Sequence, residues 1–302
     1  MKPTTLHDYR ERILRVLVHI QQNLDDDLPL GGLARIAFFS PFHFHRVFRG
    51  MVGESVKSHI RRLRLERAAS RLKQGDKPVT AIAFEAGYET HESFTRAFRA
   101  HWGESPSLFR SNRKPLRNAP APSGVHFDEA GRADGFTPHL SKGEKMEVKI
   151  ETIKPIRVAF MRHTGPYDQC GPTWGKLCAF LGPKGMLGPG SRLFGLSYDD
   201  PDVTPSDKIR YDACIEVDES FEAEGDVGVQ TVPGGRFAVT THFGPYDGLN
   251  KTYAKIMGEW LPRAGETLRA APSIEFYLND PESTDPEDLI TDIYTPLEQK
   301  VR

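Results

Sequence analysis

Two groups of basic and polar side chains, fifty residues apart, have the types and spacing needed to contact nucleic-acid bases. Phe44 and Phe48 lie four residues apart, and Phe94 and Phe98 repeat that spacing, so each pair can anchor one face of a helix in a core. The opposite face can then present arginine, which pairs in a fork with guanine O6 and N7. The side chains expected on these outward faces, and so expected to contact DNA, are Phe42, His45, Arg46, Arg49, His91, Glu92, Thr95 and Arg96.

The two groups belong to a repeat that extends beyond the aromatic anchors. Each copy closes with Gly-Glu-Ser, at 53–55 and at 103–105, which marks a structural unit used twice. Outside the arginines the outward residues differ: Phe42 can touch a thymine methyl, and Glu92 can accept from cytosine N4. We therefore expect two helices that read different bases, and one chain that binds an asymmetric site. Two helical hairpins with solvated basic faces are the alternative.

A second set of candidate residues, in the C-terminal half, combines aromatic rings with a carboxylate. This combination suits an organic cation, because ring faces attract cations and the carboxylate neutralises the charge. Asp212 and Asp292 occupy matching places in a repeat, and Asp292 is the acid expected in the pocket and the candidate general base. Ordinary core packing is the alternative for each ring. The residues expected to bind the effector are Phe160, Trp174, Tyr211, Tyr253, Asp292 and Tyr294.

The first 114 residues have the periodicity of an all-α domain that contains two helix–turn–helix units. Ser40 and Pro41 suit the N-cap and the first position of a helix, and Ser55 and Ser105 can cap the helices that follow or donate to phosphate. The second turn is one residue longer than the first. Arginines between 61 and 71 either contact phosphates or pair with acids such as Glu66. Helices are expected at 6–24, 30–37, 42–51, 56–73, 79–86 and 91–101.

The C-terminal half contains a second repeat, with an offset of 79 residues. The run His163-Thr-Gly-Pro-Tyr-Asp168 recurs as His242-Phe-Gly-Pro-Tyr-Asp247, each time after a strand-like and before a helix-like segment. A further strand pair closes each copy, so we expect strand–helix–strand–strand twice in a duplicated α+β domain. Asp168 and Asp247 are expected to lie at helix N-termini, where a hydrogen-bond acceptor and a negative charge are favourable. Strands are expected at 157–162, 210–217, 236–241 and 290–297.

The segment between the two repeats is rich in Ala, Pro, Gly and Ser and has no sustained periodicity, which is typical of a linker. The predicted architecture is therefore multidomain. It has a DNA-binding domain at 1–114, a linker at 115–146 and an effector-binding domain at 147–302.

The distribution of charge agrees with this division. The whole chain has a net charge of −1, but residues 1–117 hold 21 Lys and Arg against 12 Asp and Glu, and the remainder holds 19 against 29. Such asymmetry indicates a basic binding module joined to an acidic partner domain.

Several classes of protein are not expected from the sequence. The sequence contains no run of eighteen apolar residues, so no membrane span is expected. Arg10, Arg12 and Arg15 interrupt any apolar core of a signal peptide. The three cysteines lack metal-ligand spacing, and His163 and His242 are too few ligands for a metal site. We expect reduced thiols in a cytoplasmic protein, without cofactor or metal.

The N-terminal motifs resemble those of AraC/XylS-type transcription regulators over about the first 112 residues. The run Ser-Pro-Phe-His-Phe-His-Arg-Val-Phe at 40–48 is similar to their first helix–turn–helix, and 87–98 with Gly-Glu-Ser-Pro at 103–106 is similar to their second. The resemblance implies two recognition helices in successive major grooves. Their base contacts would come from Phe42, His45 and Arg46, and from His91, Glu92, Thr95 and Arg96, where Glu92 departs from the neutral residues of the family.

The C-terminal half resembles a GyrI-like effector-binding domain over 147–298. The similarity rests on the doubled Gly-Pro-Tyr loops, on Arg210-Tyr211-Asp212 and on the run from Asp292 to Pro296. Family members often carry a glutamate in the last strand that contacts cationic ligands, and Asp292, one methylene shorter, takes that position here. The resemblance implies a Rob-like architecture in which this domain senses a small organic molecule.

Together these features predict a non-enzymatic regulator that binds double-stranded DNA and a small-molecule effector and acts with RNA polymerase. The alternative is a small-molecule hydrolase or a drug-sequestering protein that the DNA-binding domain localises.

Overall fold

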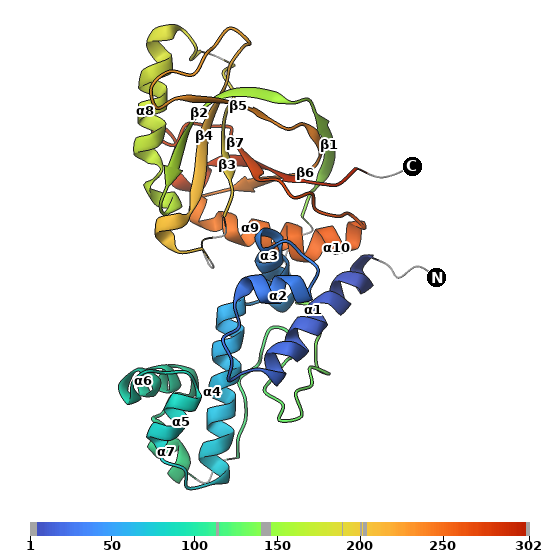
Figure 1. Ribbon diagram of the computed structural model, residues 1–302, viewed down its shortest axis with the longest axis vertical. Coiled ribbons are helices and arrows are strands. Elements are labelled where there is room, and N and C mark those ends of the chain that lie inside the picture. The colour runs from blue at the N-terminus through green and yellow to red at the C-terminus, as the bar shows by residue number, and fades with distance from the viewer. Residues whose placement is uncertain are drawn as a thin grey trace. The chain divides into compact units, whose positions relative to one another are not determined.

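The computed structural model describes residues 5–112, 115–139, 146–188, 190–199, 201 and 204–299, apart from the side chains of residues 41 and 42 (Figure 1). The chain divides into two compact units, Met1–Leu140 and Ser141–Arg302, called here the helical unit and the sheet unit. This division places residues 115–139 with the helical unit. The domain boundaries at 114 and 146 stay predictions.

The helical unit confirms the predicted all-α class. Each expected helix is present, and its ends differ from the expected ones by a few residues. A short further helix follows the second repeat copy. The helices are α1 (Thr5–Gln22), α2 (Leu30–Ile36), α3 (Pro41–Val52), α4 (Val56–Gln74), α5 (Val79–Glu85), α6 (His91–Trp102) and α7 (Pro106–Ser111).

Side-chain caps start the helices of both repeat copies. Ser40 accepts a hydrogen bond from the His43 amide at the start of α3, and Thr90 accepts one from the Ser93 amide at the start of α6. Such caps satisfy amides that lack partners within the helix. Ser55 and Ser105 cap α4 and α7 in the same way, which confirms the capping interpretation for both.

The paired phenylalanines hold both copies together. Phe44 and Phe48 have no exposed surface, and their rings lie 5.7 Å apart; Phe94 and Phe98 repeat this at 5.5 Å. Phe98 also packs edge-on against Phe109 of α7 at 5.2 Å. Burial of aromatic side chains of this size supplies roughly 2–3 kcal/mol each, so these anchors fix the tilt of α3 and α6.

The sheet unit confirms the predicted α+β class. Its described residues form an eight-stranded antiparallel sheet in the order β1-β6-β8-β7-β3-β4-β2-β5. The repeat is strand–helix–strand–strand as expected, but each copy is also preceded by a strand that the sequence does not predict, β1 or β5. The strands are β1 (Lys149–Ile153), β2 (Ile156–Thr164), β3 (Leu193–Ser197), β4 (Arg210–Glu216), β5 (Gly228–Val232), β6 (Gly235–Phe243), β7 (Ser273–Tyr277) and β8 (Ile290–Pro296).

Helices cover one face of this sheet. In the first copy, α8 (Gly171–Leu181) buries Leu177 and Leu181 against Ala213 and Ile215 of β4 (Figure 1). In the second copy, α9 (Leu249–Lys255) continues through a π-helical segment, η5 (Ile256–Trp260), into α10 (Leu261–Ala264). The face that carries Ala213 and Ile215 is called the helix face. The two copies meet where β3 pairs with β7, at the centre of the sheet.

The repeated Gly-Pro-Tyr turns are closed by histidine rather than by aspartate. His163 Nε2 lies 2.9 Å from the Pro166 carbonyl oxygen, and His242 Nε2 lies 3.1 Å from that of Pro245. Asp168 and Asp247 lie, as expected, in the first turn of helical segments, the 3₁₀ turns η1 (Tyr167–Gln169) and η4 (Tyr246–Gly248) that lead into α8 and α9. The acceptor role expected of them is not seen, because these segments begin without a side-chain cap hydrogen bond.

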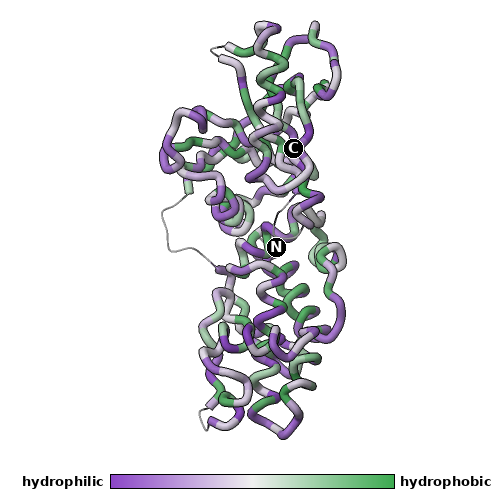
Figure 2. Tube along the Cα trace, turned by 90° about the vertical axis from the view of Figure 1, so that its left-hand side faces the viewer, coloured by the Kyte–Doolittle hydropathy of each residue, from purple (hydrophilic) through white to green (hydrophobic). Residues whose placement is uncertain are grey.

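Hydrophilic and hydrophobic residues are interspersed along the chain in both units (Figure 2). Among the described residues, no helix is both long enough and apolar enough to cross a membrane.

Candidate functional sites

The outward face of α6 has the exposure that base contact requires. Glu92 and Arg96 are exposed, and His91 and Thr95 are half-buried, whereas Phe94 is fully buried on the opposite side. The helical periodicity thus separates the anchoring face from the polar face, as the sequence predicts. Base contact by these side chains stays a prediction.

The corresponding residues of α3 differ in exposure. His45 and Arg46 are buried, with 0% and 5% of their surface exposed, and Arg49 is half-buried. The sequence predicts exposed side chains here. The backbone still directs Arg46 away from Phe44, because two residues rotate about 200° around a helix. The side chain of Phe42 lies outside the part of the chain that the structure describes.

Most arginines of α4 are used inside the helical unit. Arg62 pairs with Glu54 at 2.6 Å and with Glu66 at 2.9 Å, and Arg67 pairs with Asp25 at 2.6 Å. Arg64 donates to backbone carbonyls of the α1–α2 connection, and Arg71 pairs with Glu85. Of the two interpretations of this helix, the structure favours internal pairing over phosphate contact.

A buried carboxylate with hydroxyl partners lies on the helix face of the sheet. Glu275 of β7 has 6% of its surface exposed. Its carboxylate accepts hydrogen bonds from Ser197 Oγ at 2.7 Å, from Tyr253 OH at 2.7 Å and from Tyr277 OH at 3.2 Å. These donors come from β3, α9 and β7, so the site draws on both copies of the repeat.

Aromatic side chains extend this cluster. The hydroxyls of Tyr277 and Tyr211 lie 2.7 Å apart, and Trp174 Nε1 donates to Tyr211 OH at 3.0 Å. The ring of Tyr277 also packs edge-on against Trp174 at 5.8 Å and Tyr246 at 5.5 Å. Burial raises the pKa of Tyr211 and Tyr277 well above 10, and that of Tyr246 to about 12. The hydroxyls are therefore protonated near neutral pH and can donate.

The cluster around Glu275 is asymmetric although the fold is duplicated. Glu275 pairs across the central ladder with Gly195, which occupies the equivalent position of the first copy. A Cβ atom at Gly195 would clash with the ring of Tyr211, so that copy has no room for a second acid. Among the described residues, no ion pair involves Glu275. As far as the structure describes the chain, Glu275 is thus a buried carboxylate at the centre of the sheet without a cation beside it.

The structure brings together three of the six residues expected to bind the effector. Trp174, Tyr211 and Tyr253 lie in the cluster around Glu275. Phe160, Asp292 and Tyr294 belong to the opposite face of the sheet, because Asp292 pairs with Phe276 while Glu275 pairs with Ile293. Neighbouring residues of a strand point to opposite faces, so the shift by one position separates Asp292 from the other three.

Asp292 and Tyr294 have local partners on that opposite face. Thr241 Oγ1 donates to Asp292 at 2.6 Å, and Tyr294 OH donates to Glu151 at 3.2 Å. The residues that sequence reasoning missed are Glu275, Tyr277 and Ser197. A signal was present: in Ser-Ile-Glu-Phe-Tyr at 273–277 polar residues alternate with apolar ones, so the acid can face the same side as Tyr277.

The other repeated acid, Asp212, is already neutralised. It is fully buried, and Arg162 donates to both of its carboxylate oxygens at 2.7 and 2.9 Å. These hydrogen bonds raise the pKa of Arg162. Tyr198 and Gln230 each add a donor at 2.9 Å, so Asp212 serves the fold and is closed to a ligand.

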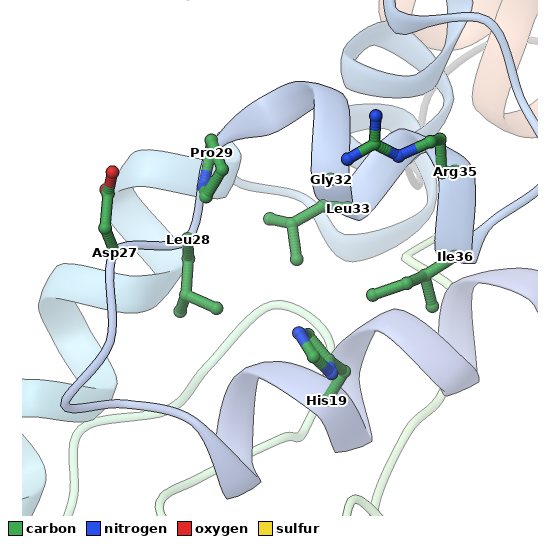
Figure 3. Close-up of a pocket in the computed structure, with 8 residues that line it drawn as sticks. All are labelled: His19, Asp27, Leu28, Pro29, Gly32, Leu33, Arg35 and Ile36. Atoms are coloured by element: carbon green, nitrogen blue, oxygen red, sulfur yellow. The ribbon is translucent and has the colours of Figure 1, made fainter.

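An open pocket also lies in the helical unit, between α1 and α2 (Figure 3). No Phe, Tyr or Trp lines it, so it lacks the features that suit an organic cation. In the described part of the chain, no group of three or more His, Cys, Asp or Glu side chains could hold a metal ion. The residues that line the pocket are His19, Asp27, Leu28, Pro29, Gly32, Leu33, Arg35 and Ile36.

Comparison with known families identifies both units. Residues 146–298 match the GyrI-like small molecule binding domain, and residues 33–112 match a helix-turn-helix domain. The chain belongs to the AraC-type regulators with a GyrI-like domain. The resemblance noted from the sequence motifs is thereby confirmed, and the regulator has the architecture of Rob.

The relatives of the regulator carry matching descriptions. The transcriptional regulator Rob of Salmonella typhimurium is 24% identical over 276 residues, which is 87% of this chain and 88% of Rob. The probable transcriptional regulator YgiV of Escherichia coli is 38% identical over 155 residues, 50% of this chain and 96% of YgiV. Among solved structures, the EcmrR C-terminal domain is 23% identical, with a TM-score of 0.41, over 51% of this chain and 99% of that one.

Proposed function

We propose that the regulator binds a small organic cation at Glu275 and reads an asymmetric DNA site with two helix–turn–helix units. The observation that carries the first part is a buried carboxylate with tyrosine donors and no cation partner among the described residues. A buried charge of this kind is unfavourable until it is paired, so a cation that enters gains the full Coulomb attraction. The surrounding rings add cation–π attraction.

The DNA-reading part rests on the duplicated helix pairs. α2 with α3 and α5 with α6 share their caps and their phenylalanine anchors, so both recognition helices leave the core in the same way. Their outward residues differ, since His45 and Arg46 stand in one helix and Glu92, Thr95 and Arg96 in the other. Different side chains in successive major grooves specify a site without a palindrome.

We further propose a protein partner and a place of action for the regulator. It contacts RNA polymerase at its promoter and works in the cytoplasm, in keeping with the relatives that are described as transcriptional regulators. A pull-down of purified polymerase by the full chain on its DNA site tests this part. Absence of polymerase from that complex would count against it.

A calorimetric titration with tetraphenylphosphonium, an aromatic monocation, tests the effector site. Glu275→Gln removes the charge but keeps the shape, and loss of one buried ion pair should weaken binding by about tenfold or more. Asp292→Asn is the matched control, because Asp292 lies on the other face of the sheet. If Asp292→Asn weakens binding and Glu275→Gln does not, the cation binds on the opposite face of the sheet and the proposed site is wrong.

A double substitution tests the DNA-reading part. Arg46→Ala with Arg96→Ala removes one arginine from each recognition helix, and each lost base contact should weaken specific binding by about 1–3 kcal/mol. Binding to a site obtained by in vitro selection is compared with binding to random DNA. Unchanged discrimination between the two would exclude base reading by these arginines.

A hydrolase remains the second candidate, because the Glu275 carboxylate among hydroxyl groups can also serve as a general base. The readout that separates the two is turnover. Consumption of an electrophilic ester by the full chain, abolished in Glu275→Gln, supports the hydrolase, and binding without consumption supports the sensor.

A further inference from the structure

Residues 121–139, called here the strap, form a closed loop on the helical unit. The Thr137 amide donates to the Ser123 carbonyl at 2.9 Å, so the two ends of the loop meet. Gly124 and Gly135 approach so closely that a Cβ atom on Gly124 would lie 2.7 Å from the Gly135 carbonyl oxygen. The strap is therefore an ordered loop with a defined neck, of the kind that packs as a unit on a protein surface.

Helix α1 holds the strap through one buried amide side chain. Gln21 has 5% of its surface exposed. Its Nε2 donates to the His126 carbonyl at 2.6 Å, and its Oε1 accepts from the Asp128 amide at 3.3 Å. This pair of bonds imitates a strand ladder and fixes the middle of the strap.

Helix α4 holds the strap through a buried acid. Glu66, with 1% of its surface exposed, accepts from the Phe127 amide at 2.8 Å and lies 3.0 Å from His126 Nδ1. Apolar side chains of the strap are buried beside these bonds: Val125, Ala133 and Phe136 have 1%, 4% and 3% exposed. Figure 1 shows this loop in green alongside α1 and α4.

The neck of the strap lies on the C-terminal end of α3. The His139 amide donates to the Met51 carbonyl at 2.6 Å, which supplies a partner for one of the last carbonyls of that helix. Gly53 follows α3 with a φ of 81°, and a Cβ atom there would lie 2.5 Å from Pro122 Cβ and 2.9 Å from His139 Cγ.

An ion-pair chain connects the same two places through α4. Arg62 joins Glu66, which holds the strap, to Glu54, which follows Gly53 at the end of α3. His59 Nδ1 adds a contact of 2.8 Å to Glu54. The strap and the end of α3 thus share one buried network, and breaking one partner of such a network leaves buried charge behind.

The second helix pair provides a contrast. Gly103 follows α6 with a φ of 80°, the same backbone state as Gly53, but its added Cβ would meet no atom within 4 Å, its chain neighbours aside, in the part of the chain that the structure describes. The strap therefore contacts the end of one recognition helix and leaves the end of the other open.

We propose that the strap is a positioning element for α3, by which a change of state in the sheet unit reaches the first DNA-reading helix and spares the second. The strap is the last described part of the helical unit before the sheet unit begins. Displacing its neck removes the His139–Met51 bond and the packing on Gly53, and so frees α3 to tilt. This inference rests on the proposed function, since the position of α3 matters only if α3 contacts DNA.

The matched pair Gly53→Ala and Gly103→Ala tests the packing of the strap on the end of α3 in the full chain. Both substitutions strain a left-handed residue equally, but only Gly53→Ala meets the strap. Hydrogen exchange of the amides in 122–139 should accelerate about tenfold or more in Gly53→Ala, because overpacking shifts the local opening equilibrium, and should stay unchanged in Gly103→Ala. Equal exchange in the two variants overturns the proposal that the strap holds the end of α3.

Gln21→Ala, which removes the two side-chain bonds from α1 to the strap, tests the coupling to DNA. On a site selected with the wild-type chain, hydroxyl-radical footprints should lose protection over the half read by α3 and keep it over the other half. Equal loss over both halves, or no loss while strap exchange is accelerated, overturns the coupling. If the wild-type chain selects no site, the proposed function fails, and the exchange comparison still decides whether the strap clamps α3.

Discussion

Two buried carboxylates in the same sheet have opposite kinds of partner. Asp212 is neutralised by Arg162 through two hydrogen bonds, whereas Glu275 accepts only from hydroxyls and pairs with no cation among the described residues. Both acids come from a duplicated unit: the first copy has Gly195 in the place of Glu275, whereas the second copy keeps an aspartate, Asp292, in the place of Asp212. The charge that a fold leaves unpaired is the one that remains available to a ligand.

The two acids also differ in their surroundings. Asp212 is held in place by the guanidinium of Arg162, which stacks 5.2 Å from the ring of Tyr198. Glu275 is held by the hydroxyls of Ser197, Tyr253 and Tyr277, and burial raises the pKa of Tyr277 above its usual range, so this donor stays neutral. In the described part of the chain, the first acid is therefore paired with a charged group and the second with neutral donors.

The largest expected effect comes from removing the cation of the paired acid. Arg162→Met leaves Asp212 buried and uncompensated, which should lower the free energy of unfolding by about 2 kcal/mol, less than for a fully buried pair because half of the Arg162 side chain is exposed. Denaturant unfolding of the full chain measures it. Adding Asp212→Asn to this variant should recover part of the loss, and no recovery would mean that lost packing, not charge, dominates.

Next in size is the loss of one hydroxyl from the unpaired acid. Tyr277→Phe removes a donor to Glu275 and a partner of Tyr211, so the free energy of unfolding should fall by roughly 1–2 kcal/mol. Tyr294→Phe is the control, because its hydroxyl bonds to Glu151 at 3.2 Å on the other face and should cost less than about half as much. Equal losses would remove the distinction between the two faces.

Neutralising each acid should change the free energy of unfolding differently for Glu275 and for Asp212. Glu275→Gln should change the free energy of unfolding by less than about 1 kcal/mol, or raise it, because an uncompensated buried charge disappears. Asp212→Asn should lower it by more, since Arg162 then loses its partner. The same unfolding titration measures both, and a loss in Glu275→Gln as large as in Asp212→Asn would make Glu275 a structural acid.

The smallest expected effect concerns alkaline pH. Burial raises the pKa of Tyr246 to about 12, so its stabilising contribution is complete below pH 10 and is lost as pH rises from 10 to 12, where the unfolded chain ionises first. Tyr246→Phe should reduce this loss by less than about 1 kcal/mol, because 37% of the residue is exposed. Unfolding free energies at pH 9 and pH 11 measure it, and an identical pH dependence in both chains would contradict the raised pKa.

The strap shows a limit of composition as a guide. The segment is rich in Ala, Pro, Gly and Ser, which predicts a linker, yet Val125, Ala133 and Phe136 are buried and Gln21 and Glu66 bind its backbone. Its partners are about sixty to one hundred residues away in sequence, and local periodicity carries no information about such contacts.

Residue types and their spacing were enough to predict the repeats, the fold classes of both units, the anchoring phenylalanines and the caps Ser40, Ser55 and Ser105. These follow from short-range periodicity and residue type, which act over a few residues. The three-dimensional fold was needed to place Glu275, and not Asp292, beside Trp174, Tyr211 and Tyr253. The face to which a strand residue points is set by its register with neighbouring strands, and a shift of one position moves an acid from one side of the sheet to the other.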